Sequence, residues 1–288
     1  RISVLHQGRM IADGKPNEVA RDPEVIAAYL GASEEGGRAA VPKVERIAHA
    51  QAKLILHVEK VASGYGGSTV LSDLSIVVHE GEAVALLGRN GVGKTTTLRA
   101  ITGTLPLASG DIRFNDKSLK SLKPYEINRL GISLVPEGRR LFPILTVVEN
   151  LQLAARPGGI SIEDVFELFP RLRTRQRAKA ENLSGGERQM VAIARALVVP
   201  SKLILLDEPF EGLAPAVVNE VMEALVKLRG KVAMVLVEHH AETVLPIADR
   251  AYVLVNGQVA YEGDAEDLEK DEALQAKLLG VVHGENAA

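Results

Sequence analysis

The chain has 288 residues, of which 46% are hydrophobic and 25% are charged, so it is long enough to bury a large core. Its net charge of −3 argues against a protein that binds nucleic acid through bulk electrostatics. The lack of cysteine excludes disulfides, zinc–thiolate sites and thiol catalysis. No apolar run approaches the roughly 18 residues of a membrane span, so we expect any role at a membrane to depend on a partner.

The two ends of the chain contain a repeat. Residues 1–31 align without a gap with residues 250–280, so that Gly14 stands opposite Gly263 and the apolar positions keep the same phase. Both copies place glycine where a hairpin and a strand-to-helix turn need it. We therefore expect residues 1–31 to be the C-terminal tail of a preceding, homologous unit in a fused polypeptide. Residues 32–51, rich in Ala, Gly, Glu and Lys, have the composition of a linker.

Residues 52–288 have the pattern of one α/β domain. Hydropathy alternates, as in half-exposed antiparallel strands, in the segments LILHVEKV and STVLSDLSIVV. Short apolar runs, typical of strands buried on both faces, occur in AVALLG, ISLVP, LILLD and VAMVLVE. We expect a mostly parallel core sheet with an antiparallel β subdomain and a helical subdomain at about 138–188. Helical patterns cover residues 94–102, 124–130, 147–155, 162–169, 185–198 and 215–228.

A phosphate-binding motif follows the first buried strand. The string GRNGVGKT, residues 88–95, fits the pattern G-x-x-x-x-G-K-[ST] of P-loop NTPases and leads into a helix. Lys94 would reach the β- and γ-phosphates of a nucleotide, and Thr95 would supply a hydroxyl to Mg²⁺. The alternative, a plain glycine-rich turn, is disfavoured by the strand and helix on either side. The residues that turn backbone N–H groups toward phosphate are Gly88, Gly91 and Gly93.

Two acidic residues end a later buried strand. The string LILLDE places Asp207 and Glu208 at its carboxyl end, where ligands of open α/β sheets bind. We expect Asp207 to hold Mg²⁺, directly or through water, and Glu208 to orient and polarise the attacking water. In isolation such a pair could equally cap the next helix; beside a phosphate loop the catalytic interpretation is favoured.

The string LSGGERQ, residues 183–189, predicts a second phosphate-binding helix end. Ser184 would cap the helix, and Gly185 and Gly186 would leave backbone N–H groups exposed at its positive end. The alternative is a capped helix start without a ligand, since S-x-x-E resembles a capping box. One nucleotide cannot use this helix end together with the phosphate loop of the same subunit.

These motifs together resemble the ABC (ATP-binding cassette) ATPases over residues 53–280. The resemblance implies that two such units dimerise head to tail, so that each signature helix closes on ATP held by the other phosphate loop. It implies that Tyr65 stacks on adenine, and that Asn90 and Thr96 join the nucleotide site. It also implies that His239 is the switch histidine that contacts the γ-phosphate. Taken alone, a loop tyrosine such as Tyr65 is more often a packing residue, and a histidine after a strand such as His239 could equally have no role.

Two positions depart from the wider family. Glu137 stands where most ABC ATPases have a glutamine that touches Mg²⁺ and relays the nucleotide state to the permease. Glutamate is still a hard oxygen ligand, so we expect metal contact there as well. Ala214 stands where many relatives have aspartate, so communication across the dimer through that side chain is not expected.

The strings VPEGRRLFPILTVVENL, LSGGERQMVAIARAL and LDEPFEGLAP resemble the LivF-type ATPases of branched-chain (hydrophobic) amino-acid importers. The end of the N-terminal tail, DPEVIAAYLG, resembles the sister LivG-type ATPase. The resemblance implies ATP hydrolysis with Mg²⁺ and a second ABC ATPase unit, either a homodimer or a LivG-type heterodimer. It implies permease subunits that contact Glu137 and an apolar groove around Leu141–Leu151. It further implies an indirect link to a periplasmic or extracellular solute-binding protein, a peripheral place on the cytoplasmic face of the bacterial inner membrane, and no nucleic acid.

Other functions fit some of these features. The ATPase of lipopolysaccharide export resembles this subfamily, but its strings differ from VPEGRRLFP. A soluble ABC ATPase of DNA repair would need long coiled coils between Lys94 and Ser184, where there is no room for them. One that acts in translation would fit a fusion of two units, but residues 32–51 are neither long nor strongly charged. A regulatory protein that binds ATP without hydrolysis is opposed by the intact Glu208.

Overall fold

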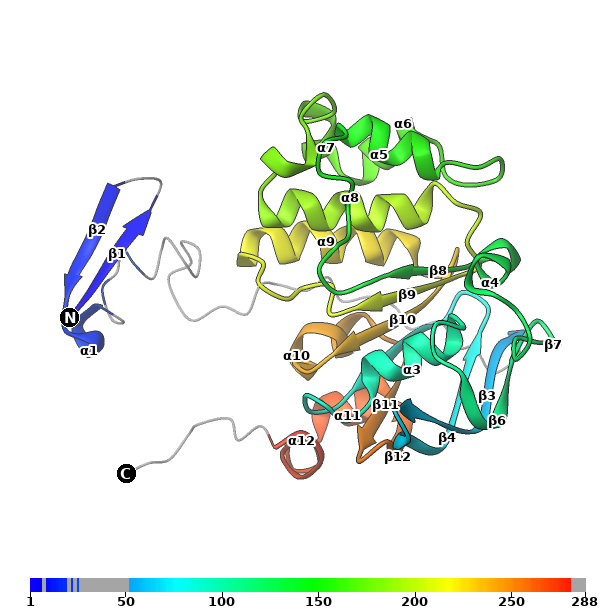
Figure 1. Cartoon of the computed structure of the whole chain (residues 1–288). Helices are drawn as coiled ribbons and strands as arrows, with labels where there is room; N and C mark the ends of the chain where they lie inside the picture. The colour runs from blue at the N-terminus through cyan, green and yellow to red at the C-terminus, as the bar shows by residue number, and fades with distance from the viewer. Residues whose placement is uncertain (7–8, 20–21, 23–24, 26–51, 281–288) are drawn as a thin grey trace.

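A six-stranded sheet forms the centre of the molecule, in the strand order β12-β11-β5-β10-β9-β8 (Figure 1). The computed structural model describes residues 1–6, 9–19, 22, 25 and 52–280. Neighbouring strands run parallel except at one edge, where β12 pairs antiparallel with β11, so the predicted mostly parallel core sheet is confirmed. Its strands are β5 (Ala83–Leu87), β8 (Ile132–Val135), β9 (Leu203–Asp207), β10 (Ala233–Glu238), β11 (Arg250–Val255) and β12 (Gln258–Asp264).

Both faces of this core sheet are buried. Successive residues of a strand point to opposite sides, so each strand contributes to two separate hydrophobic cores. In β5, Ala83, Ala85 and Leu87 belong to one hydrophobic core, whereas Val84 and Leu86 belong to another. The first core lies against the long helices, and the second lies against the antiparallel subdomain. Burial on both faces is the reason why the strand is an unbroken apolar run in the sequence.

The antiparallel subdomain is a four-stranded sheet in the order β4-β3-β6-β7. The alternation of hydropathy predicts its first two strands but not β6, which is interrupted by Gly110. A Cβ at Gly110 would lie 2.5 Å from the carbonyl oxygens of Glu59 and Lys60, so glycine is required where the two strands shift register. The strands are β3 (Leu54–Tyr65), β4 (Ser68–His79), β6 (Leu107–Phe114) and β7 (Lys117–Ser118).

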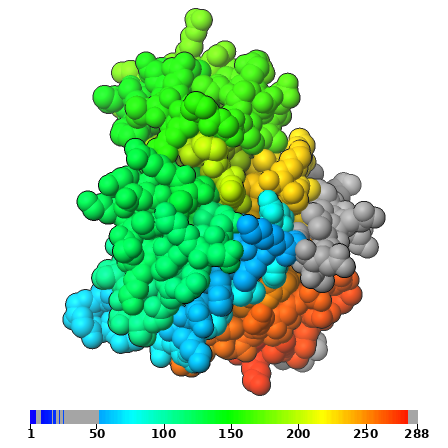
Figure 2. All heavy atoms as spheres, turned by 90° about the vertical axis from the view of Figure 1, so that its right-hand side faces the viewer, coloured from blue at the N-terminus to red at the C-terminus, as the bar shows by residue number. Residues whose placement is uncertain are grey.

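Helices cover the core sheet, and Figure 2 shows the helical layer, in green, as a lobe at one end of the molecule. The six predicted helices are present, with ends within one residue of the prediction. Among the described residues, no helix combines the length and the apolar character that a membrane crossing requires. The α-helices after the N-terminal segment are α3 (Lys94–Ile101), α4 (Pro124–Leu130), α5 (Val147–Ala154), α6 (Ile162–Leu168), α7 (Pro170–Thr174), α8 (Gly185–Leu197), α9 (Pro215–Leu228), α10 (Ala241–Val244), α11 (Ala265–Lys270) and α12 (Glu272–Leu279). Two short 3-10 helices are η1 (Ala180–Asn182) and η2 (Leu245–Ile247).

The N-terminal segment forms a hairpin of its own, whose backbone repeats that of β11 and β12. Ile2 pairs with Gly14 just as Ala251, at the equivalent position of the repeat, pairs with Gly263. The register shift also falls at equivalent places, between Val4 and Leu5 in one hairpin and between Val253 and Leu254 in the other. The elements are β1 (Ile2–His6), β2 (Arg9–Gly14) and the short helix α1 (Pro16–Val19).

The polar contacts of the two hairpins correspond as well. Arg1 pairs with Asp13 at 2.8 Å, and Arg250 pairs with Glu262 at the equivalent positions of the C-terminal hairpin. Sequence, register and ion pair therefore agree that the two hairpins are copies of one structural unit. The interpretation of residues 1–31 as the tail of a preceding unit stays a prediction, and residues 32–51 lie outside the described part of the chain.

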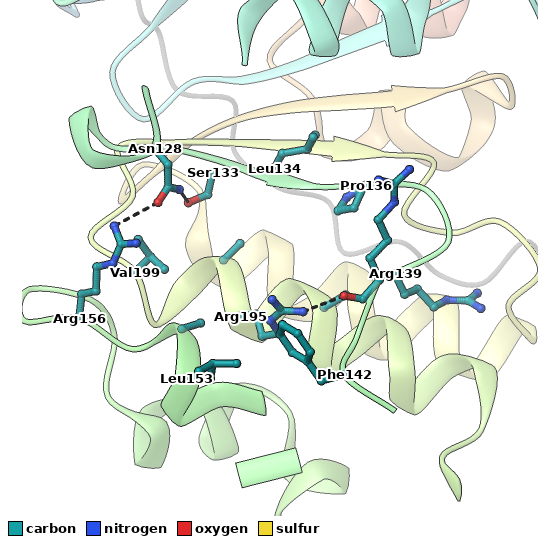
Figure 3. Close-up of a pocket in the computed structure, with 14 residues that line it drawn as sticks. Asn128, Ser133, Leu134, Pro136, Arg139, Phe142, Leu153, Arg156, Arg195 and Val199 are labelled. Carbon is teal, nitrogen blue, oxygen red and sulfur yellow. Dashed lines mark hydrogen bonds between the residues drawn. The ribbon is translucent and has the colours of Figure 1, made fainter. Parts of the chain in front are cut away.

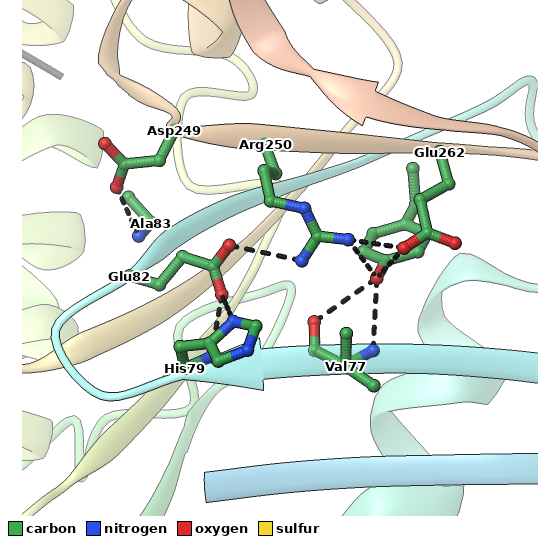
Figure 4. A network of polar contacts seen from close by, with 8 residues as sticks. Val77, His79, Glu82, Ala83, Asp249, Arg250 and Glu262 are labelled. Atoms are coloured by element: carbon green, nitrogen blue, oxygen red, sulfur yellow. Dashed lines mark hydrogen bonds and ion pairs between the residues drawn. The ribbon is translucent and has the colours of Figure 1, made fainter. Parts of the chain in front are cut away.

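Buried ion pairs join the core sheet to its neighbours at the start of β5 (Figure 4). The fully buried Glu82 pairs with Arg250 at 3.3 Å. Asp249 accepts a hydrogen bond from the backbone N–H of Ala83 at 2.9 Å and pairs with the buried Arg229. Glu82, Arg229 and Asp249 are buried and Arg250 is partly buried, so these charges depend on their partners.

Replacing Asp249 with alanine is expected to lower the free energy of unfolding by about 3–5 kcal/mol, because the buried guanidinium of Arg229 loses this carboxylate and the Ala83 N–H loses its acceptor. Urea denaturation followed by circular dichroism would measure this. Glu163→Ala is the control, since it breaks an exposed ion pair with Arg173 and should cost less than about 1 kcal/mol. Equal losses in both variants would contradict the importance of burial.

Candidate functional site

The predicted phosphate loop lies between the end of β5 and the start of α3. Gly93 has φ of 111°, and a Cβ there would lie 2.6 Å from Leu71 Cδ2, so only glycine fits. The ammonium of Lys94 is buried in the loop and donates hydrogen bonds to the carbonyl oxygens of Gly88, at 2.7 Å, and Arg89, at 3.1 Å. Burial lowers the pKa of Lys94, and nearby carboxylates act in the opposite direction.

Two of the predicted metal ligands touch each other. The Thr95 hydroxyl donates a hydrogen bond to Asp207 Oδ1 at 3.1 Å, which joins the start of α3 to the end of β9. Burial raises the pKa of Asp207; the bond from Thr95 lowers it, and the carboxylate of Glu137 raises it again. A hydroxyl with two carboxylates is the set of hard oxygen donors that suits Mg²⁺, so these residues fit the predicted ion.

Glu208 lies beside both Lys94 and His239. Its Oε1 is 4.0 Å from the Lys94 Nζ and 3.9 Å from the His239 Nδ1. Glu208 has φ of 50°, a left-handed conformation that is strained for a residue with a side chain. Burial raises the pKa of Glu208 and lowers the pKa of His239, so burial disfavours the charged form of each group.

Glu211, for which the sequence predicts no role, lies in the same site. Carboxylate oxygens of Glu137, Glu208 and Glu211 all lie within 4.8 Å of one another. Glu211 adds to the raised pKa of Glu208 through its charge and through a side-chain hydrogen bond. The string FEGLAP places Glu211 in the loop after the catalytic pair, but the folding back of that loop could not be read from the sequence.

The predicted capped helix at the signature string is present. The Ser184 hydroxyl accepts a hydrogen bond from the Glu187 N–H at 3.2 Å, and the Glu187 carboxylate accepts one from the Ser184 N–H at 2.8 Å. A Cβ at Gly186 would lie 2.4 Å from Val217 of α9, so this glycine also serves packing. No hydrogen bond or ion pair among the described residues joins Ser184, Gly185 or Gly186 to the phosphate loop.

The remaining predicted nucleotide residues surround the loop. Tyr65 ends β3 with its side chain partly exposed, and its hydroxyl accepts a hydrogen bond from Arg99 of α3 at 2.9 Å. Asn90 is exposed at the turn of the loop, whereas Thr96 is buried within α3. Their contacts with nucleotide stay predictions.

A groove of about 430 Å³ lies between the core sheet and the helical layer (Figure 3). Its described lining contains no acidic side chain but four arginines, namely Arg139, Arg140, Arg156 and Arg195. Arg195 stacks over Phe142 at 5.2 Å from the ring centroid, and its Nε is buried without a hydrogen-bond partner. The expected apolar groove around Leu141–Leu151 stays a prediction; Phe142 and Ile144 are exposed apolar side chains in that segment, whereas Leu151 is fully buried.

The sequence matches the family described as ABC transporter over residues 71–211, and its N-terminal segment matches the family described as branched-chain amino acid ATP-binding cassette transporter over residues 9–35. It is 44% identical to the high-affinity branched-chain amino acid transport ATP-binding protein BraG of Pseudomonas aeruginosa, over 71% of this chain and 91% of that protein. The chain belongs to the ATP-binding proteins of ABC transporters. The chain is therefore an enzyme that hydrolyses ATP, and its predicted membership of the ABC ATPase family is confirmed.

Other relatives and a solved structure agree. The chain is 36% identical to the probable branched-chain amino acid transport ATP-binding protein LivF of Archaeoglobus fulgidus, over 79% of this chain and all of that protein. The lipopolysaccharide export ATP-binding protein LptB of Escherichia coli is 32% identical over 78% of this chain and 97% of that protein. A nucleotide-free ATP-binding cassette from an ABC transporter superposes with a TM-score of 0.69, at 29% identity, over 81% of this chain and 100% of that structure. The predicted fold class is confirmed.

Proposed function

We propose that ATP is hydrolysed at the meeting point of β5, β9 and β10 in this ABC ATPase. The observation that carries the proposal is the cluster of Lys94, Glu208 and His239, in which both basic nitrogens lie within 4.0 Å of one carboxylate oxygen. Lys94, together with the backbone N–H groups of the loop, holds the phosphates of ATP. Glu208 orients the attacking water and accepts its proton, and His239 contacts the γ-phosphate.

Mg²⁺ would be held by Thr95 and Asp207, with Glu137 as a further oxygen donor. When bound, the ion neutralises charge that develops on the phosphate oxygens. Thr95 and Asp207 are already within hydrogen-bond distance of each other, so the chain supplies this part of the site before nucleotide arrives. The hydrogen bond between them orients the Asp207 carboxylate toward the phosphate loop.

A second ATPase unit completes the site. Ser184, Gly185 and Gly186 form a positive helix end that the phosphate loop of the same chain does not use, which supports a head-to-tail dimer. The second unit is either a copy of this domain or the homologous unit of which residues 1–31 are the tail. The matching registers and ion pairs of the two hairpins support the latter.

The transport system that we propose for this ATPase is an importer of branched-chain or other hydrophobic amino acids, on the cytoplasmic face of the bacterial inner membrane. The names of BraG and LivF support this solute class, as does the family matched by residues 9–35. The lower identity to LptB makes lipopolysaccharide export the second candidate. In either system the ATPase works with membrane permease subunits.

The basic groove is the surface that we propose for the permease. Its four arginines, without acidic neighbours in the lining, favour a cytoplasmic helix that carries carboxylates. The exposed side chains of Phe142 and Leu153 offer apolar contact for the other face of such a helix. Arg156→Glu should therefore abolish the stimulation of ATPase activity by permease, whereas the exposed Lys120→Glu, away from the groove lining, should not.

The experiment that tests the solute class is an ATPase assay of the chain with its permease in lipid, titrated with binding proteins loaded with different amino acids. Stimulation by a protein loaded with leucine is expected. ATPase activity that responds to no loaded binding protein, but to lipopolysaccharide, would favour export. A response to ribosomes or DNA alone would contradict a role in transport.

A further inference from the structure

Glu238, a carboxylic acid without a predicted role, lies next to the proposed catalytic residues Glu208 and His239. Glu238 is the last residue of β10, at the centre of the core sheet, and pairs in register with Leu87, which precedes the phosphate loop. It is the one acidic residue of an otherwise apolar strand, and its side chain is only 3% exposed. Burial raises the pKa of Glu238 to about 7, because the buried surroundings disfavour the charged form of the carboxyl. Burying a carboxyl costs free energy unless hydrogen bonds or charges compensate for it, so its contacts are informative.

The carboxyl of Glu238 holds the loop that follows Glu208. Its Oε1 accepts a hydrogen bond from the backbone N–H of Phe210 at 3.2 Å. Pro209 has no N–H to donate, so Phe210 offers the first such group after Glu208. The N–H of Glu208 itself donates to the carbonyl oxygen of Val237 at 3.0 Å. Two successive residues of β10 thus anchor the backbone on either side of the Glu208 side chain.

These anchors explain how Glu208 is held in a strained conformation. A residue with a side chain is strained at φ of 50°, and this conformation persists only where the surroundings determine it. Without the bond from Phe210, the backbone after Glu208 could relax toward the β or α region. The Glu208 carboxylate would then leave its place beside Lys94 and His239.

The second oxygen of the same carboxyl faces the switch histidine. Glu238 Oε2 and Glu208 Oε1 each lie 3.9 Å from the Nδ1 of His239, which is buried without a hydrogen-bond partner. One side chain therefore borders both the loop that carries Glu208 and the histidine that contacts γ-phosphate. No other described side chain accepts a hydrogen bond from the backbone of residues 208–210.

We propose that Glu238 is a positioning residue for ATP hydrolysis, which acts by holding the Phe210 N–H and thereby fixes the direction of the Glu208 side chain. Glu238 itself touches no reacting atom. The inference rests on the proposed catalytic role of Glu208. It requires a hydrogen-bond acceptor at this place and does not require a negative charge.

Three substitutions of Glu238 test this requirement. Glu238→Gln keeps the acceptor oxygen in place without the charge, and its kcat should stay within about 3-fold of the wild type. Glu238→Asp keeps the charge but withdraws the acceptor by one methylene, and Glu238→Met removes it at similar volume. Both should lower kcat about 10–100-fold, since misplacement by about 1 Å can cost about 100-fold. The KM for ATP and the affinity for a fluorescent ATP analogue should change less than about 3-fold.

The kcat values of the three variants, ranked against one another, distinguish the possible outcomes. Low kcat in Glu238→Gln with normal kcat in Glu238→Asp would mean that the charge matters, and would overturn the proposal. Normal kcat in both Glu238→Asp and Glu238→Met would overturn it as well. If Glu238 served only the stability of the fold, kcat would fall in each variant in proportion to the loss in the midpoint temperature of thermal unfolding. We expect instead that Glu238→Asp remains folded and still loses kcat. A wild-type chain that binds ATP but never hydrolyses it, with or without permease, would instead contradict the proposed function.

Discussion

Replacing Glu208 with glutamine is expected to lower ATP turnover about 100- to 10,000-fold, the range by which a general base accelerates proton transfer. The amide keeps the size of the side chain but cannot accept the proton of the attacking water. ATP binding should persist, because Lys94, Thr95 and the glycine loop are unchanged. Steady-state phosphate release would measure turnover, and equilibrium binding of a fluorescent ATP analogue would measure affinity.

The same variant should gather into dimers when ATP and Mg²⁺ are present, since nucleotide that cannot be hydrolysed holds the two units together. Size-exclusion chromatography with light scattering would detect this. Glu223→Gln is the control, because Glu223 is exposed on α9 and is not among the predicted site residues. Unchanged turnover in Glu208→Gln would refute the catalytic assignment.

The site could be predicted from the sequence where a local string specifies its own geometry. The phosphate loop needs glycine at Gly93 for a left-handed turn before a helix, and the string carries it at that place. The helix at Ser184 begins with a capping box that four consecutive residues encode. The buried strands that end at Leu87 and Asp207 are unbroken apolar runs, so their ends could be located to the residue.

The features that the sequence did not reveal depend on contacts between distant segments. Glu238 reads as the polar end of a strand, and its hydrogen bond to Phe210 becomes visible only when β9 and β10 lie side by side. The basic character of the groove arises because Arg156 and Arg195, far apart in the sequence, meet on one surface. Gly186 belongs to both groups. The sequence motif predicts its place in a ligand site, whereas its close packing against Val217 becomes visible only in the folded structure.

The second large effect is expected at Lys94. Replacing Lys94 with alanine should weaken ATP binding about 10- to 100-fold, since a hydrogen bond to a charged group contributes about 1.5–3 kcal/mol. Without nucleotide the ammonium donates to carbonyl oxygens of its own loop and lies 4.0 Å from Glu208, and burial lowers its pKa. We expect its removal to affect nucleotide binding more than the stability of the fold, because the ammonium faces the place of the phosphates.

Thermal unfolding with and without ATP separates these two effects. Ligand binding raises stability by RT ln(1 + [L]/Kd), so a wild-type chain at saturating ATP should unfold at a higher temperature than the free chain. Lys94→Ala should unfold near the wild-type temperature without nucleotide, but ATP at the same concentration should raise it much less. Lys120→Ala, an exposed lysine away from the phosphate loop, should respond to ATP as the wild type does. If Lys94→Ala retained the full response to ATP, the phosphate would have to be held by other groups, and the role of this loop would be refuted.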